Sequence, residues 1–256
     1  MWKSSLLALV LTLALSSTAL AHFGMVIPSD SIVENRKDAT IDIELSFSHP
    51  MEQAGMPLTA PKAFQVITDG KASDIRTSLK PIKIMDHDAW KGQYTIRKPG
   101  VYQFVMEPQP YWEEAEDCFI IHYTKTYVAA FGEEEGWDQP AGLKTEIIPL
   151  TRPFGNYAGN VFCGQVLLDG KPVPGAEVEI EYYNRDKKYT APNACMVTQV
   201  VRADADGVFT YGIPLAGWWG FAALNTSDKK MSYKGKQKDV ELGAVVWMEF
   251  VAPSVR

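Results

Sequence analysis

Alternation of apolar and polar residues with a period of two is the feature that most constrains the fold of this chain. From Ile41 to Ser48 every odd-numbered residue is apolar and every even-numbered residue is polar. This is the period of a strand with one buried face. Similar short runs, bounded by glycine and proline, recur along the chain with almost no helical periodicity. The sequence therefore predicts an all-β protein built from β-sandwiches.

The strand-like runs fall into two groups separated by a polar stretch. The runs that we expect to form strands are 41–49, 63–68, 93–96, 101–106, 118–123, 164–168, 177–183, 198–203, 208–211, 218–224 and 242–248. Lys98-Pro99-Gly100 and Asp204–Gly207 are turn sequences, each predicted to close a hairpin between its flanking runs. Residues 132–160 are polar and broken by glycine and proline, which indicates a connection. We predict an N-terminal domain over 22–131 and a C-terminal domain over 161–256.

The first residues have the pattern of a cleaved export signal. Lys3 is followed by an apolar run from Leu6 to Leu15, and Ala19-Leu20-Ala21 gives the small-x-small pattern of a signal-peptidase site. The apolar run is shorter than the ~20 residues needed to span a bilayer. Residues 1–21 are therefore expected to be a signal peptide, leaving a protein in the periplasm without stable membrane insertion.

Charge and cysteine content narrow the possible partners. The formal net charge is −6, and it becomes −7 when Lys3 is removed with the leader. An acidic chain is not expected to bind nucleic acid or anionic lipid, and it tolerates cations. Cys118, Cys163 and Cys195 match no zinc-binding spacing, and the sequence leaves open whether Cys163 and Cys195 form a bridge or remain thiols.

Only four histidines occur, and all lie in the predicted N-terminal domain. Cleavage after Ala21 would make His22 the first residue, so that its α-amine and imidazole Nδ1 could close a chelate ring on a metal. His49 continues the apolar face of its strand, and His122 lies on the buried face of the 118–123 run. We predict His22, His49 and His122 as ligands. His87 is expected in an exposed turn, with a weaker case for binding metal.

Nitrogen donors of this kind suit nickel, copper, cobalt or zinc better than calcium or magnesium, and ligand type alone does not select among them. Glu116 and Asp117 precede the strand of His122 and could orient its ring, although an acidic loop is also often only solvated. Nearby methionines would suit Cu(I) but are better explained as core residues. No nucleophile elbow or phosphate-binding glycine loop is present, so we expect no enzymatic activity.

Several blocks of sequence resemble known families. The pattern over 164–183 is similar to transthyretin-like or carboxypeptidase-regulatory sandwiches, and the N-terminal unit is expected to be immunoglobulin-like. The blocks Ala21-His22-Phe23-Gly24, Ser48–Glu52 and Tyr111–Asp117 resemble periplasmic proteins of energy-coupling-factor-type nickel/cobalt uptake transporters. The further blocks of this resemblance are 119–125, 136–138, 145–153 and 217–221.

That resemblance implies capture of Ni(II), or Co(II), outside the inner membrane and delivery to the membrane components of a nickel/cobalt transporter. Carried over by position, His22, His49 and His122 would be the ligands, and Glu52, Glu116 and Asp117 would orient them. Two other interpretations stay open. One is a Cu(II) protein, either a periplasmic carrier or an oxidative polysaccharide-cleaving enzyme with an N-terminal histidine brace. The other is a docking module whose histidines are structural.

Overall fold

The computed structural model describes residues 22–253 of the chain. The predicted signal peptide and its cleavage site after Ala21 lie outside the described residues. Within them the regular structure consists of strands, apart from three single-turn 3-10 helices, η1 (Arg36–Asp38), η2 (Arg76–Ser78) and η3 (Ala194–Met196). The predicted all-β class is confirmed.

The first outer sheet carries the N-terminus of the described chain. Its strands, in spatial order, are β1 (Phe23–Pro28), β3 (Thr40–His49), β8 (His87–Thr95) and β7 (Lys80–Ile84), with β4 (Ala54–Met56) paired to the end of β3. All of these pairings are antiparallel.

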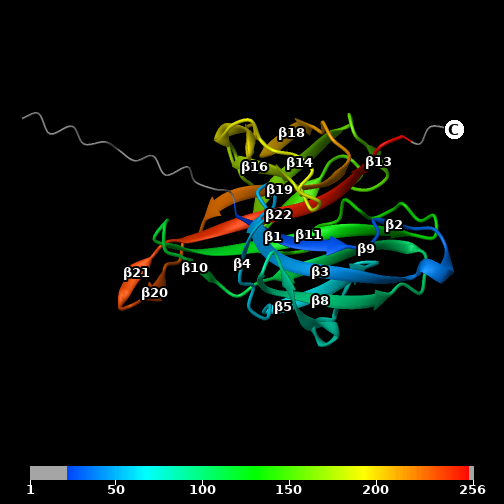
Figure 1. The fold of residues 1–256 in the computed structure, drawn as a ribbon, viewed down its shortest axis with the longest axis horizontal. Coiled ribbons are helices and arrows are strands. Elements are labelled where there is room, and N and C mark those ends of the chain that lie inside the picture. The colour runs from blue at the N-terminus through cyan, green and yellow to red at the C-terminus, as the bar shows by residue number, and fades with distance from the viewer. Residues whose placement is uncertain (1–21, 254–256) are drawn as a thin grey trace, which may run out of the picture.

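The central sheet takes strands from both halves of the chain (Figure 1). Its order is β17 (Gln199–Arg202), β16 (Glu177–Tyr182), β19 (Gly217–Thr226), β22 (Val240–Val251), β11 (Cys118–Ala130), β9 (Gly100–Glu107), β5 (Ala63–Thr68) and β6 (Lys71–Asp74). Short strands β2 (Ile32–Val33) and β10 (Tyr111–Glu113) pair with β11, and β13 (Asn156–Tyr157) pairs with β22. The two halves join where β11 and β22 run parallel, with His122 opposite Gly243.

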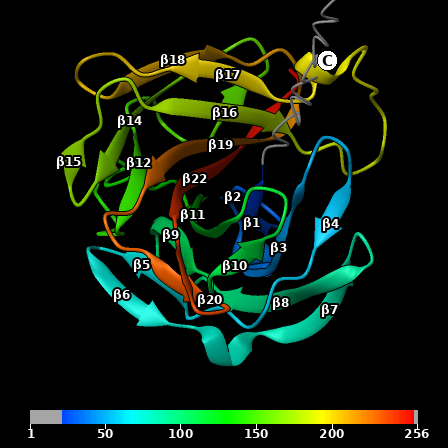
Figure 2. The ribbon, with the colours of Figure 1, turned by 90° about the vertical axis from the view of Figure 1, so that its left-hand side faces the viewer.

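The second outer sheet comprises β12 (Thr145–Pro149), β14 (Val161–Leu168), β15 (Lys171–Pro172) and β18 (Val208–Gly212). A separate two-stranded hairpin is formed by β20 (Met231–Tyr233) and β21 (Lys236–Lys238). Figure 2 shows the two outer sheets on opposite sides of the central one.

Alternation along β11 explains how one sheet serves two sandwiches. Ile120 and Val128 pack into the apolar cluster shared with the first outer sheet, whereas Tyr127 and Ala129 pack into the cluster shared with the second. Successive strand residues point to opposite faces, so a strand that is apolar on both faces is buried between two layers. The β-sandwich architecture is thus confirmed, with the central sheet common to both sandwiches.

Two predicted hairpins are wrong. The runs 93–96 and 101–106 do form strands, β8 and β9, but β8 pairs with β3 and β7 while β9 pairs with β5 and β11. In the same way β17 pairs with β16, whereas β18 pairs with β14. At both places the chain crosses from one sheet to another instead of turning back along itself.

The stretch 132–160, predicted as a connection, contributes to two sheets. β12 pairs with β14, and β13 pairs in parallel with β22. Cys118, Cys163 and Cys195 are all free thiols. Among residues 22–253, no helix has the length and apolar character needed to cross a bilayer.

Candidate metal centre

His22 and His49 lie next to each other at one end of the first outer sheet. β1 and β3 are antiparallel, with Phe23 opposite Ser48, so the next step of the register sets His22 opposite His49. Their ring centroids are 4.7 Å apart, and both residues are buried. The alternation of β3 turns His49 to the same face as Phe47, which faces the central sheet.

His122 reaches the same place from β11 of the central sheet. It is 1% exposed, and its ring occupies space left by two glycines. A Cβ at Gly24 would lie 2.3 Å from Thr124 Oγ1 and 3.1 Å from the Cβ of His122. A Cβ at Gly243 would lie 2.3 Å from Cδ2 of the same ring. These glycines therefore allow β1 and β22 to approach the imidazole closely.

Phe47 joins the three histidines into one cluster. Its ring is stacked on His22 at a centroid distance of 5.7 Å and meets His122 edge-on at 5.7 Å. The predicted ligands His22, His49 and His122, which come from three different segments, are thus brought together in the space between the first outer sheet and the central sheet.

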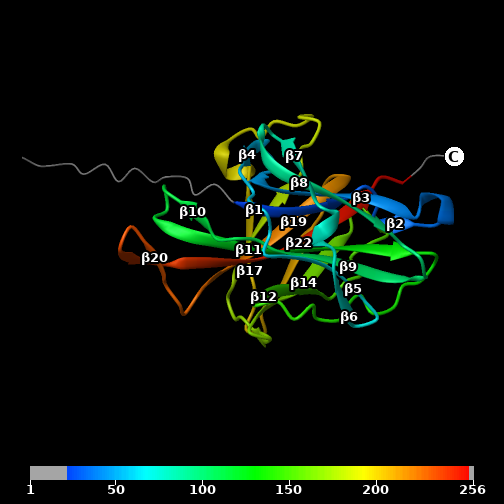
Figure 3. The same cartoon turned by 90° about the horizontal axis from the view of Figure 1, so that it is seen from below.

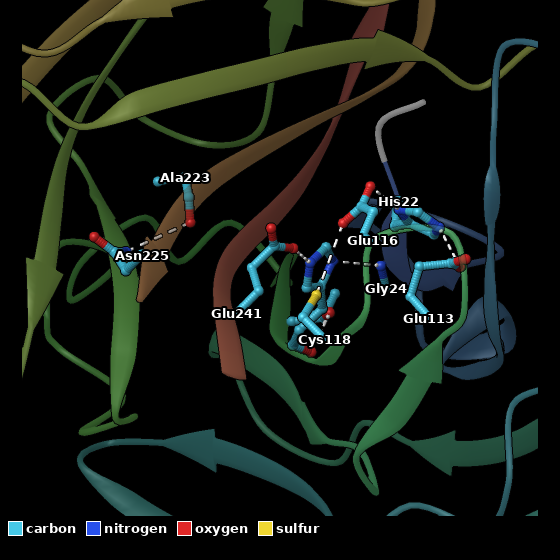
Figure 4. A network of polar contacts seen from close by, with 10 residues as sticks. His22, Gly24, Glu113, Glu116, Cys118, Ala223, Asn225 and Glu241 are labelled. Atoms are coloured by element: carbon cyan, nitrogen blue, oxygen red, sulfur yellow. Dashed lines mark hydrogen bonds and ion pairs between the residues drawn. The ribbon is translucent and has the colours of Figure 1, made fainter. Parts of the chain in front are cut away.

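Two carboxylates orient two of the imidazole rings (Figure 4). His22 Nε2 lies 3.0 Å from Glu113 Oε2, and His122 Nε2 lies 3.1 Å from Glu241 Oε1. An ionised carboxylate only accepts, so each of these Nε2 atoms carries the proton and each Nδ1 keeps its lone pair. The Nδ1 of His122 accepts a long hydrogen bond, at 3.4 Å, from the backbone N–H of Gly24.

Burial and the two neighbouring imidazoles lower the pKa of His22 together. Burial, followed by repulsion from His49 and His122, lowers the pKa of His22 from 6.5 to about 4, although Glu113 opposes the shift. The imidazole of His22 is therefore neutral at pH 7, the state in which it can donate a lone pair to a metal.

In the described conformation, no three His, Cys, Asp or Glu side chains within residues 22–253 are arranged as a set that could hold a metal ion. The backbone nitrogen of His22 is an amide in the uncleaved chain and becomes an amine only when the chain begins at this residue.

The other predicted residues lie at different distances from the cluster. Glu116 Oε1 is 4.0 Å from His22 Nδ1, so Glu116 borders the site. Asp117 instead accepts from the ammonium of Lys238. Glu52 is exposed in the turn after β3, and His87 starts β8 beside Gly55, half-buried and not in an exposed turn.

Sequence reasoning did not single out the two carboxylates that contact the rings. Glu113 lies in the same acidic stretch as Glu116, and β10, with three residues, is too short for its alternation to set Glu113 apart. Glu241 is separated from His122 by 119 positions and reaches it only through the parallel pairing of β11 and β22. No local pattern indicates that contact.

Cys118 borders the cluster, with Sγ 3.9 Å from Glu116 Oε2 (Figure 4). Burial, together with the charges of Glu241, Glu116 and Glu113, raises the pKa of the Cys118 thiol to about 12. The sulfur is therefore protonated at neutral pH, whereas metal ligation by cysteine uses the thiolate.

Solved structures show only distant similarity to this chain. The Yersinia pseudotuberculosis adhesin InvE matches with a TM-score of 0.26 and 12% identity, over 86% of this chain and 58% of the adhesin chain. The D0-D1 domain of intimin matches with a TM-score of 0.23 and 9% identity, over 88% of this chain and 99% of that one. At such TM-scores the fold assignment rests on the strand pairing alone.

No curated protein matches the sequence. A family profile does match, over residues 19–227, a range that includes every histidine of the chain. The match covers most of the sequence, so the chain belongs to the family described as "Domain of unknown function (DUF4198)".

Proposed function

We propose that this protein is an exported transition-metal carrier that binds Ni(II), or Co(II), through His22, His49 and His122 and delivers it to a membrane uptake transporter. The observation that carries the proposal is the convergence of three buried histidines from β3, β11 and the residue before β1. Burying a polar imidazole is costly unless polar partners compensate it, and Glu113 and Glu241 do so for His22 and His122.

Carboxylate partners strengthen the proposal. Histidines that bind metals commonly donate their second ring N–H to a carboxylate, which fixes the tautomer and the ring orientation. Glu113 does this for His22 and Glu241 does it for His122. The nitrogens left with lone pairs are the Nδ1 atoms. For His22 this is the nitrogen that forms a chelate ring with the α-amine of the processed chain.

The same donor set supports a second candidate, a periplasmic Cu(II) carrier. Amine and imidazole nitrogens bind Cu(II) more tightly than Ni(II) or Co(II) in the usual order of divalent metals. Preference for nickel must therefore come from geometry or from metal supply. A copper enzyme with a histidine brace would in addition consume peroxide on chitin or cellulose in a copper-dependent way, which a carrier would not do.

Equilibrium dialysis tests the proposal directly. The protein recovered after export, with its N-terminus determined, would be dialysed against Ni(II), Co(II), Cu(II) and Zn(II) separately and in competition. We expect one tightly bound ion per chain, lost in the H22Q/H49Q double variant. Absence of tight binding for all four metals would refute a carrier role and leave the histidines as structural residues.

A further inference from the structure

The hairpin β20–β21 concentrates positive charge on an acidic protein. Between Asp228 and Asp239 the chain has five lysines and only these two acidic residues, whereas the whole sequence has a formal charge of −6. Of the five, Lys229, Lys230, Lys234 and Lys236 are exposed, and Lys230 is paired with Asp239 at 2.8 Å. The turn at Lys234-Gly235 has φ values of 48° and 80°, as a tight two-residue hairpin turn requires, and it places Lys234 and Lys236 at the tip.

The hairpin stands apart from the three large sheets but is held at its base. Its strands pair only with each other. Tyr233 is stacked on Trp112 of β10 at a centroid distance of 3.8 Å, and Lys238 is paired with Asp117. Figures 1 and 3 show the hairpin projecting at the same end of the molecule as β10. The next residue of β10, Glu113, contacts His22, so the hairpin and the histidine cluster share this end.

We propose that the β20–β21 hairpin docks the protein onto anionic lipid headgroups at a membrane surface. Beyond about 8–10 Å charges are screened at physiological salt, so a projecting cluster acts through its own charge and not through the net charge of the chain. Lysines close to an anionic surface are attracted to it, and clusters of about 4–8 basic residues are typical of such contacts.

The type of residue favours lipid over an acidic protein surface. All basic residues between 228 and 239 are lysines, and none is arginine. Lysine is a compact, hydrated point charge on a flexible stem, whereas bidentate recognition of carboxylates is the role of the arginine fork. Lysines spread around a hairpin tip suit a plane of headgroups better than a specific arrangement of carboxylates.

Vesicle co-sedimentation of the exported protein, in metal-free buffer with chelator, tests this inference separately from metal binding. One set of vesicles contains phosphatidylglycerol in phosphatidylcholine, and the other contains phosphatidylcholine only. The K229Q/K230Q/K234Q/K236Q variant removes the exposed lysines of the hairpin and keeps Lys238. The matched control K37Q/K71Q/K98Q/K171Q removes four exposed lysines from other parts of the surface, and thermal unfolding verifies that both variants fold.

We expect salt-sensitive binding to the phosphatidylglycerol vesicles only, reduced at least about tenfold in the hairpin variant and less than about twofold in the control. Equal binding to both kinds of vesicle, equal losses in both variants, or no vesicle binding by the unaltered protein would each overturn the proposal. If vesicles are not bound but a transporter-containing membrane captures the protein through the same lysines, the hairpin recognises an acidic protein instead.

Discussion

The imidazole rings of His22 and His49 lie opposite each other across the β1–β3 pair, with their centroids 4.7 Å apart. This contact depends on strand register, because a slip of one residue would turn one of the rings to the other face of the sheet. Other buried residues of the two strands fix that register by packing into the core: Val26 on β1, and Leu45 and Phe47 on β3.

Replacement of His49 is expected to weaken metal binding, whereas replacement of His87 is not. His49 lies beside His22, while His87 lies on β8 against Gly55. We expect H49A to raise the nickel dissociation constant at least about tenfold, equivalent to ~1.4 kcal/mol. Isothermal titration of H49A and H87A would measure this difference. Equal losses of nickel affinity in the two variants would show that His49 is not a specific ligand.

Removal of the Glu241 carboxylate, which contacts His122, is expected to weaken metal binding, although Glu241 is not itself predicted to bind the ion. Glu241 fixes the tautomer that leaves a lone pair on Nδ1, and partners of this kind contribute about 10–100-fold to metal affinity. E241Q should show a loss in that range by titration. The D117N variant is the control, because Asp117 pairs with Lys238 and contacts none of the rings. A larger loss in D117N than in E241Q would contradict the assignment of Glu241.

The close approach of β1 to β11 makes Gly24 sensitive to substitution. The added methyl group of G24A would lie 2.3 Å from Thr124 Oγ1, so the strands must separate or the side chain must rotate. Overpacking of this kind costs about 1–3 kcal/mol in the free energy of unfolding. Gly212 is the matched control, since no atom lies within 4 Å of the position that an added methyl would take there. Denaturant unfolding would measure both variants. A lower free energy of unfolding for G212A than for G24A would be inconsistent with this packing.

Glu181 gives the pH dependence of stability a definite sign. Burial raises the pKa of Glu181 from its ordinary value of 4.5 to about 8, although Thr198 and the N–H of Met51 donate to the carboxyl group and oppose the shift. A raised pKa means that the folded state favours the protonated acid. The stabilising contribution of Glu181 to the free energy of unfolding is therefore fully present below pH 4.5 and is lost as pH rises through 8.

The isosteric E181Q variant should remove that contribution to pH dependence. Relative to the unaltered protein, we expect the variant to gain stability between about pH 5 and 9, by ~2–4 kcal/mol at the upper end. Denaturant unfolding at several pH values measures the difference. A stability difference that does not change with pH would show that Glu181 is ionised in the folded protein throughout this range.

The sequence indicated many of the strands but not their partners, and it missed β1, β7 and the hairpin β20–β21. Alternation identified the run that became β3 and turned His49 to the buried face, because burial on one face leaves a period of two in the sequence. Strand-like runs flank Lys98-Pro99-Gly100 whether the two strands pair with each other or enter different sheets. The hairpin predicted there was wrong for this reason.

Long-range pairing also limited the prediction of the site. His22, His49 and His122 stood out because histidine is rare in this chain. Glu241 and Gly243 became neighbours of His122 only through the parallel alignment of β11 with β22, which leaves no local mark in the sequence. The acidic loop was recognised, but its alternation over three residues was too short to separate Glu113, which contacts His22, from Asp117, which contacts Lys238.

The central claim is that a metal is bound by a chain that begins at His22. The most direct test is nickel equilibrium dialysis of the exported protein beginning at His22, beside the same protein with extra residues retained before it. The account predicts that the extension weakens binding at least about tenfold, or ~1.4 kcal/mol, because it replaces the α-amine with an amide. Equal affinity of the two forms would contradict it.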